Sequence, residues 1–90
     1  MANRTPKQLE RHFKGVANHR RIEILKLIGN KKGLALDEIA ETIGASVPTI
    51  SEHTRKLVQA GLMEKKYRGR NVEHFLSPYG EKMLQILRPF

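Results

Sequence analysis

Between Leu36 and Leu57 the chain holds two short amphipathic helical segments joined by one glycine turn, a spacing that two ordinary packed helices would produce only occasionally. Ala40 is small where two helices can cross closely, Gly44 follows four residues later where a turn needs positive φ, and Ile50 follows after six more. Ser46 can cap the second helix, whose first turn tolerates Pro48. The segment therefore has the spacing of a helix-turn-helix, in which a short turn makes the second helix project from the body.

Two short strands are predicted directly after the second of these helices. Residues 63–67 and 72–76 flank Arg68-Gly69-Arg70-Asn71, which is a hairpin turn signal. Arg68 and Arg70 make the tip basic, and Lys65 and Lys66 precede it in the first strand. A helix-turn-helix followed by a basic-tipped hairpin is typical of a winged helix. In that fold the wing, here residues 67–71, can reach the minor groove or the phosphates of DNA.

The rest of the chain predicts three further helices, so the fold class is mainly α with a small β-hairpin, in one domain over residues 1–90. The order is helix, helix, a possible brief strand at 34–36, helix, helix, strand, strand, helix. The second helix is expected to stop at Gly29-Asn30, since both residues tolerate positive φ. His74 alternates with Val72 and Leu76 and is expected under the hairpin. The predicted capping residues are Thr5, Asn18, Ser46 and Ser77.

Charge favours a polyanionic partner. Seventeen Lys and Arg against nine Asp and Glu leave a net charge of +8. Residues 1–21 carry six basic and one acidic side chain, and residues 46–70 carry six and two. Solubility alone would explain the excess equally well, but the second basic block coincides with the helix that is expected to project outward.

Helical periodicity divides the recognition helix, about residues 46–60, into two faces. Ile50, Thr54, Leu57 and Val58 define the inner face, and His53 at its border is expected to be a core or hinge residue. Glu52 either accepts a hydrogen bond from a cytosine or pairs with Arg55 or Lys56, and the sequence does not choose between these roles. The residues expected to contact double-stranded DNA are Ser46, Pro48, Thr49, Ser51, Glu52, Arg55 and Lys56 on this helix, with Arg68 and Arg70 on the wing.

Three stretches resemble motifs of a known family. Residues 17–25 read Ala-Asn-His-Arg-Arg-Ile-Glu-Ile-Leu, and residues 46–53 read Ser-Val-Pro-Thr-Ile-Ser-Glu-His. They are similar to Ala-Asn-Pro-x-Arg-x-x-Ile-Leu and Ser-Gln-Ser-Thr-Val-Ser-His-His of ArsR-type winged-helix transcriptional regulators. Ala60-Gly61-Leu62 and Gly69-Arg70 resemble the residues that frame the wing in that family. The resemblance covers Ala17 to Leu76. It implies a winged-helix fold, DNA binding and a role as a transcriptional repressor.

Departures from the family pattern limit what carries over. Val47, Pro48 and Glu52 replace polar residues and a histidine that commonly contact bases, so the usual base contacts do not transfer. The chain has no cysteine, and His12, His19, His53 and His74 lack ligand spacing, so no metal and no cofactor is expected. The Ser-Pro-x-Gly opening of the last helix is similar to MarR- and PadR-type regulators.

A homodimer is the expected assembly. The first and last helices, within residues 1–16 and 78–90, hold more apolar residues than a compact body of this size can cover, although ordinary core packing would also account for them. In the resembled family these helices form the dimer interface. The expected interface residues are Leu9, Phe13, Val16, Met83, Leu84, Leu87 and Phe90. The basic residues Arg4, Lys7, Arg20 and Arg21 are further candidates for phosphate contacts.

Other classes of function fit the sequence less well. No stretch is apolar enough to span a membrane and no signal peptide is evident, so a cytoplasmic protein is expected. Ser51 and His53 point in different directions on a helix and cannot pair for catalysis, so an enzyme is not expected. The alternative to sequence-specific regulation is a winged helix that docks on proteins or binds nucleic acid, such as RNA, without sequence preference.

Overall fold

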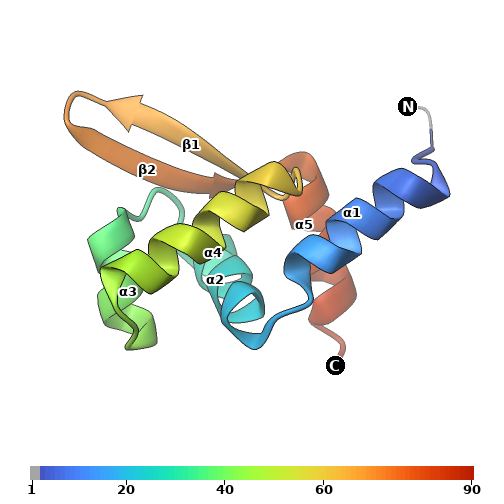
Figure 1. Cartoon of the computed structure of the whole chain (residues 1–90), viewed down its shortest axis with the longest axis horizontal. Helices are drawn as coiled ribbons and strands as arrows, with labels where there is room; N and C mark the ends of the chain where they lie inside the picture. The colour runs from blue at the N-terminus through green and yellow to red at the C-terminus, as the bar shows by residue number, and fades with distance from the viewer. Residues whose placement is uncertain (1–2) are drawn as a thin grey trace.

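The computed structural model describes residues 3–90, which form five helices and one two-stranded antiparallel sheet (Figure 1). The predicted order and fold class are confirmed, and residues 1 and 2 of the predicted 1–16 segment lie outside the description. No helix within residues 3–90 is long and apolar enough to cross a membrane. The elements are α1 (Pro6–Val16), α2 (His19–Asn30), α3 (Leu36–Ile43), α4 (Val47–Gln59), β1 (Met63–Arg68), β2 (Asn71–Leu76) and α5 (Pro78–Leu87).

The helices begin where the sequence supplies a cap. Thr5 Oγ1 accepts from the Gln8 amide, and the Gln8 side chain accepts from the Thr5 amide, which completes the predicted capping box. Asn18 and Ser77 cap α2 and α5 in the predicted manner, since their side chains accept amide hydrogens of the first turn. Ala35 has no side-chain acceptor at the start of α3, but its amide donates to Glu38 Oε1.

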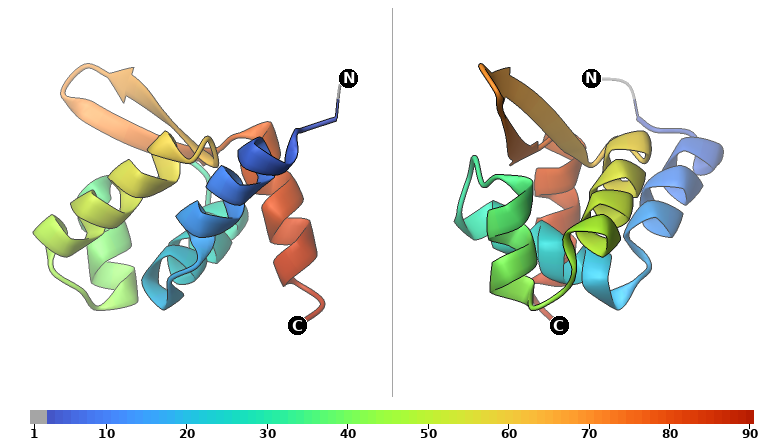
Figure 2. Two further views of the ribbon diagram at one scale, coloured as in Figure 1. Left: turned by 45° about the vertical axis from the view of Figure 1, so that its right-hand side comes forward. Right: turned by 60° about the vertical axis from the view of Figure 1, so that its left-hand side comes forward.

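The core surrounds α2, whose residues Ile24, Leu25 and Ile28 are completely buried. Helices α3, α4 and α5 and the hairpin pack around it. Figures 1 and 2 show α4 lying along one side of the body, with the hairpin projecting beyond the helices and α1 beside α5 at the end away from α3. Both ends of the described chain lie at this α1–α5 end (Figure 1).

The hairpin pairs Met63 with Leu76 through to Arg68 with Asn71. The brief strand considered at residues 34–36 is a single bridge between Leu34 and His74, and α3 already begins at Leu36. His74 is buried as predicted, and its Nδ1–H donates to the Leu34 carbonyl at 2.8 Å. Burial lowers the pKa of His74, so the fold favours the neutral ring.

Helix α2 ends at Asn30, close to the predicted stop, but the predicted cause, a positive φ at Gly29-Asn30, is wrong. Both residues are helical, and the first positive φ after the helix is at Gly33 (+84°). Gly29 serves packing instead, because a Cβ there would stand 2.2 Å from Leu84 Cδ2. A glycine that admits a neighbouring helix has the same sequence signature as one that ends its own helix, so the local pattern indicated the wrong role.

Gly80 is the glycine on which the placement of α5 most depends. A Cβ on Gly80 would lie 1.9 Å from the backbone oxygen of Leu62, which cannot move as a flexible side chain could. We expect Gly80→Ala to lower the free energy of unfolding by about 2 kcal/mol or more, the cost typical of overpacking a core. Urea unfolding of this variant beside Gln85→Ala, an exposed change on the same helix, measures the effect. Equal midpoints for the two variants would contradict the close contact of α5 with the α4–β1 connection.

Candidate nucleic-acid interface

Helix α4 is anchored by one face and open on the other. Ile50, Thr54 and Leu57 are completely buried and Val58 is half-buried, which confirms the predicted inner face. The Ser46 hydroxyl accepts the Thr49 amide at 3.3 Å, so the predicted cap holds the first turn. All the helix residues predicted to meet DNA are exposed: Ser46, Pro48, Thr49, Ser51, Glu52, Arg55 and Lys56.

The turn between α3 and α4 has the predicted geometry. Gly44 adopts φ +79°, and the amides of Gly44 and Ala45 both donate to the Ala40 carbonyl. Ala40 is buried where the helices meet. A Cβ at position 44 would meet no atom within 4 Å, so steric crowding does not require glycine there. The positive φ of the turn does, because glycine adopts it without strain. This turn sets α4 at an angle to α3 and leaves the first turn of α4 on the surface.

Glu52 is held by Arg55. The Arg55 guanidinium donates two hydrogen bonds to the two carboxylate oxygens, one of them from Nε to Oε2 at 3.1 Å. The bond from Arg55 lowers the pKa of Glu52, and the carboxylate raises the pKa of Arg55. Of the two roles considered for Glu52, the structure contains the ion pair. Its effect is to keep one cation of the exposed face partly neutralised.

His53 lies at the edge of the apolar face, half-buried, next to Arg21 of α2. Arg21 Nη1 donates to His53 Nδ1 at 3.3 Å, and Arg21 Nε donates to the Gly15 carbonyl at 2.6 Å. Burial and then the Arg21 charge lower the pKa of His53, which keeps the ring neutral and able to accept. His53 therefore joins α4 to α2 and does not face outward with Thr49 and Glu52.

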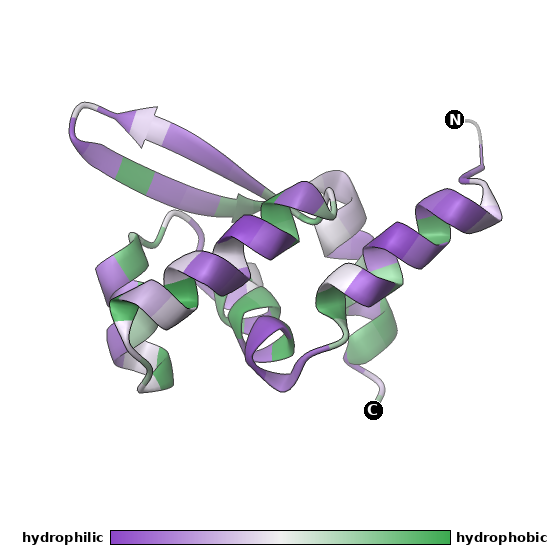
Figure 3. Ribbon diagram, in the orientation of Figure 1, coloured by the Kyte–Doolittle hydropathy of each residue, from purple (hydrophilic) through white to green (hydrophobic). Residues whose placement is uncertain are grey.

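The wing carries Arg68 and Arg70 on either side of Gly69, and all three are exposed. Gly69 has φ +59°, as its turn requires. Arg68 Nε pairs with Glu73 Oε1 at 3.1 Å, a contact across the hairpin that sequence spacing did not indicate. Figure 3 shows hydrophilic residues along most of both strands and along the outer side of α4.

Sequence reasoning missed Tyr67 as a candidate functional residue of the wing. The residue is 75% exposed. It lines a hollow of about 150 Å³ between the wing and α4, together with Lys65 and Ser51. Because side chains alternate along a strand, the pattern Met63, Lys65, Tyr67 could have placed this face toward α4.

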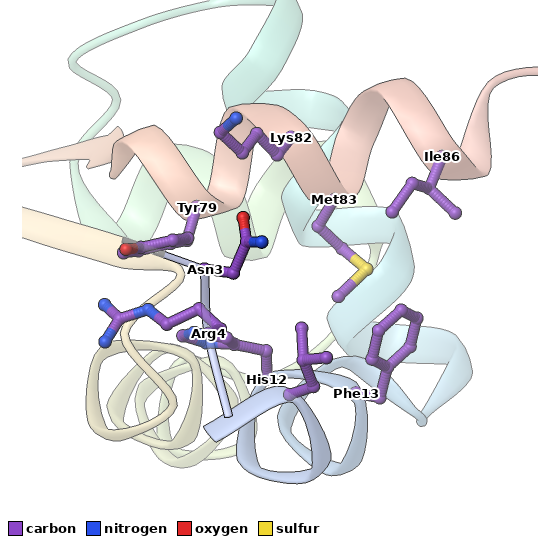
Figure 4. Close-up of a pocket in the computed structure, with 9 residues that line it drawn as sticks. Asn3, Arg4, His12, Phe13, Tyr79, Lys82, Met83 and Ile86 are labelled. Atoms are coloured by element: carbon purple, nitrogen blue, oxygen red, sulfur yellow. The ribbon is translucent and has the colours of Figure 1, made fainter. Parts of the chain in front are cut away.

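The α1–α5 surface is only partly apolar on the outside. Three residues predicted at a dimer interface are instead buried in the core of the chain itself: Val16, Met83 and Leu84. For these three residues the prediction is corrected. Leu9 and Phe13 are 44% and 46% exposed, and Phe90 is 97% exposed. These two α1 residues line a hollow of about 370 Å³ with Met83 and Ile86 of α5 (Figure 4).

His12 connects this surface to the end of α4. The ring is buried, stacks on Tyr79 at a centroid distance of 4.9 Å, and donates from Nδ1 to the Ala60 carbonyl at 2.7 Å. Arg4, a candidate for phosphate contact, instead lies over the ring of Tyr79 at 3.9 Å. Arg20, another candidate, pairs with Glu23. Ala60 and Tyr79 are distant in sequence from His12 and Arg4, so local patterns could not reveal these contacts, whereas Glu23 is only three residues from Arg20.

Within residues 3–90 no three His, Asp or Glu side chains gather as a metal ligand set would require.

A comparison with curated protein sequences found no match. Among solved structures the chain is similar to HlyU from Vibrio cholerae, with 22% identity, a TM-score of 0.86, and coverage of 98% of this chain and 96% of that one. This likeness shows the fold.

Two further structures share the architecture. One is the homodimeric winged helix-turn-helix DNA-binding domain of Mb0332 from Mycobacterium bovis, described as a possible ArsR-family transcriptional regulator. It has 24% identity and a TM-score of 0.84 over 99% of this chain and 88% of that one. The other is the transcriptional repressor PagR of Bacillus anthracis, with 18% identity and a TM-score of 0.82 over 90% and 93% of the two chains.

The sequence-level comparison agrees with the structural one. The model of the MarR family matches residues 17–69, which run from the start of α2 to the tip of the wing. That range contains the helix-turn-helix and most of the hairpin, and it makes up more than half of the chain. The match therefore shows that this chain belongs to the MarR family, and its fold is the winged helix-turn-helix of the similar solved structures.

Proposed function

We propose that this protein is a homodimeric regulator of transcription, acting as a repressor, that binds specific sequences of double-stranded DNA. The observation that carries the proposal is the division of α4. One face is fixed in the core, and the other presents polar and cationic side chains that nothing within residues 3–90 covers. In winged-helix proteins such a helix enters the major groove, and the wing lies on the minor groove or on phosphates.

The residues of α4 take different roles along the helix. Thr49, Ser51 and Glu52 lie in its N-terminal half, which reaches deepest into the groove, and are assigned to base edges with Ser46 and Pro48 beside them. Arg55 and Lys56 lie further back and are assigned to phosphates. On the wing, Arg68 and Arg70 contact the minor groove or its phosphates.

The dimer is assigned to α1 and α5, within residues 1–16 and 78–90. Leu9, Phe13, Ile86 and Phe90 leave large apolar side chains exposed there, and Leu87 is half-buried beside them. The similar winged-helix domain of Mb0332 is homodimeric, which supports the assignment. A two-fold axis at this surface would set the two α4 helices roughly 34 Å apart, about one turn of DNA.

Two aspects of the proposal are drawn from the relatives. PagR is described as a repressor, which supports repression by this chain. The named relatives are bacterial, and a bacterial chromosome lies in the cytoplasm, so we place the protein there.

The wing provides the first test. Arg68→Ala combined with Arg70→Ala removes two guanidinium groups from its tip, and we expect duplex affinity to fall at least about tenfold, because a hydrogen bond from a charged group contributes about 1.5–3 kcal/mol. Fluorescence anisotropy with a labelled duplex measures the change. Lys26→Ala with Lys31→Ala removes the same charge from exposed sites outside the interface. Equal affinities for both double variants would contradict the wing's role.

Glu52 provides a test of specificity. Glu52→Gln removes a carboxylate that repels phosphate and frees Arg55 from its ion pair. We expect binding to non-specific duplexes to tighten severalfold, so the ratio of specific to non-specific affinity narrows. Competition binding measures that ratio, with Glu64→Gln as the control for net charge. An unchanged ratio would place Glu52 outside the DNA contact.

The dimer is tested at Phe13. Phe13→Glu sets a carboxylate in the proposed apolar interface, where burying an unpaired charge is costly, so we expect a monomer at micromolar concentration. Sedimentation equilibrium distinguishes the two states, and Gln85→Glu adds the same charge to an exposed site of α5. A Phe13→Glu variant that remains dimeric, or a parent chain that is monomeric, would refute the assigned interface.

A further inference from the structure

Helix α1 presents two stripes with opposite character. Leu9, Phe13 and Val16 follow the spacing i, i+4, i+7, and Leu9 and Phe13 line a hollow together with residues of α5. Lys7, Arg11 and Lys14 follow the same spacing two residues earlier, which places them about 160° away around the helix, and all three are exposed. Two residues of this cationic stripe, Arg11 and Lys14, line a hollow of about 460 Å³ between α1 and α4.

We call this hollow the α1–α4 cleft. It is lined by four cationic side chains, Arg11 and Lys14 of α1, Arg21 of α2 and Lys56 of α4, together with Gly15, Gln59 and Ala60. Among the described residues, 3–90, no acidic side chain lines it. Within residues 3–90, the acidic residue that pairs with a lining residue is Glu10, whose Oε2 lies 3.7 Å from Lys14 Nζ. Both side chains are exposed to solvent, so this ion pair offsets little of the positive charge of the cleft. Gathering four like charges opposes folding, so an anion that occupied the cleft would be favoured.

Close packing of the two helices brings these charges together. A Cβ on Gly15 would lie 2.1 Å from the Cβ of Ala60, so only glycine lets the C-terminal ends of α1 and α4 approach this closely. Arg11 lies over the same region, because a Cβ on Gly61 would stand 3.0 Å from its Nη2. Arg21 is fixed at the base of the cleft by its bonds to the Gly15 carbonyl and to His53.

The cleft borders the exposed face of α4. Lys56 and Gln59 belong both to the lining and to that face, one and two helical turns after Glu52. A DNA strand beside a groove occupied by α4 carries one phosphate per roughly 3.4 Å of axis, so its backbone would continue past the C-terminal half of α4. The regularly spaced charge of a phosphodiester chain suits cations that are contributed by three different helices.

We propose that the α1–α4 cleft binds the DNA backbone beside the major-groove segment entered by α4, with Arg11 and Lys14 as phosphate ligands. The inference rests on the proposed function. It makes α1 a third DNA-contacting element besides α4 and the wing, and it assigns two residues that the sequence did not single out. These contacts strengthen binding to every duplex and carry no base preference.

The test is the salt dependence of binding. Arg11→Gln with Lys14→Gln removes both charges from exposed helical positions with little effect on helix propensity. Each phosphate contact contributes about 0.9 to the slope of log K against log salt, so the slope should become shallower by about 1.8 per bound protomer. Affinity at low salt should fall on specific and non-specific duplexes by the same factor, and the preferred sequence should not change.

The matched control is Lys26→Gln with Lys31→Gln, which lowers the net charge equally at exposed positions outside the cleft. The thermal melting of both variants is compared with that of the parent, and a shallower slope in an Arg11→Gln, Lys14→Gln variant that melts at or above the parent's temperature supports the cleft. Slopes that match between the two double variants, or an altered sequence preference, would overturn the inference while leaving the proposed function intact. A parent chain that binds no duplex would overturn both.

Discussion

The burial of one face of α4 is the interaction on which the rest of the structure depends. Ile50, Thr54 and Leu57 pack without any exposed surface against α2 and α3. A helix has about 3.6 residues per turn, so fixing these three positions also fixes where every other side chain of α4 points. The exposure of the opposite face, which includes Thr49 and Glu52, therefore follows from the packing of the core.

Residues at the C-terminal end of α4 then form hydrogen bonds to α1 and to the start of α5. The Ala60 carbonyl accepts from His12 of α1. The Gly61 carbonyl accepts the hydroxyl of Ser77 at 2.6 Å, and the Leu62 carbonyl accepts the Ser77 amide at 3.1 Å. Three successive backbone oxygens thus connect α4 with the helices assigned to the dimer.

Most of the fold could be predicted from local sequence, because its determinants are local. Thr5, Asn18, Ser46 and Ser77 cap the helices that they precede, and Gly44, Gly61 and Gly69 adopt the positive φ that their turns require. The nine residues expected to contact DNA are all exposed, although contact with DNA remains a prediction.

The features that the sequence could not predict are long-range. The role of Gly29 depends on Leu84, and the buried position of His12 depends on Ala60 and Tyr79. The α1–α4 cleft combines residues up to 49 positions apart, as Arg11 and Ala60 are, and no periodicity in one helix could show that they meet.

Selection of binding sites from a pool of random DNA duplexes tests the central claim most directly, because it asks whether the exposed face of α4 reads bases. The proposed function predicts enrichment of an inverted repeat whose two half-sites are centred about 10 base pairs apart, one for each α4 of the dimer. Uniform recovery of all sequences, or retention of RNA in preference to duplex DNA, would contradict it and favour the non-specific nucleic-acid-binding alternative.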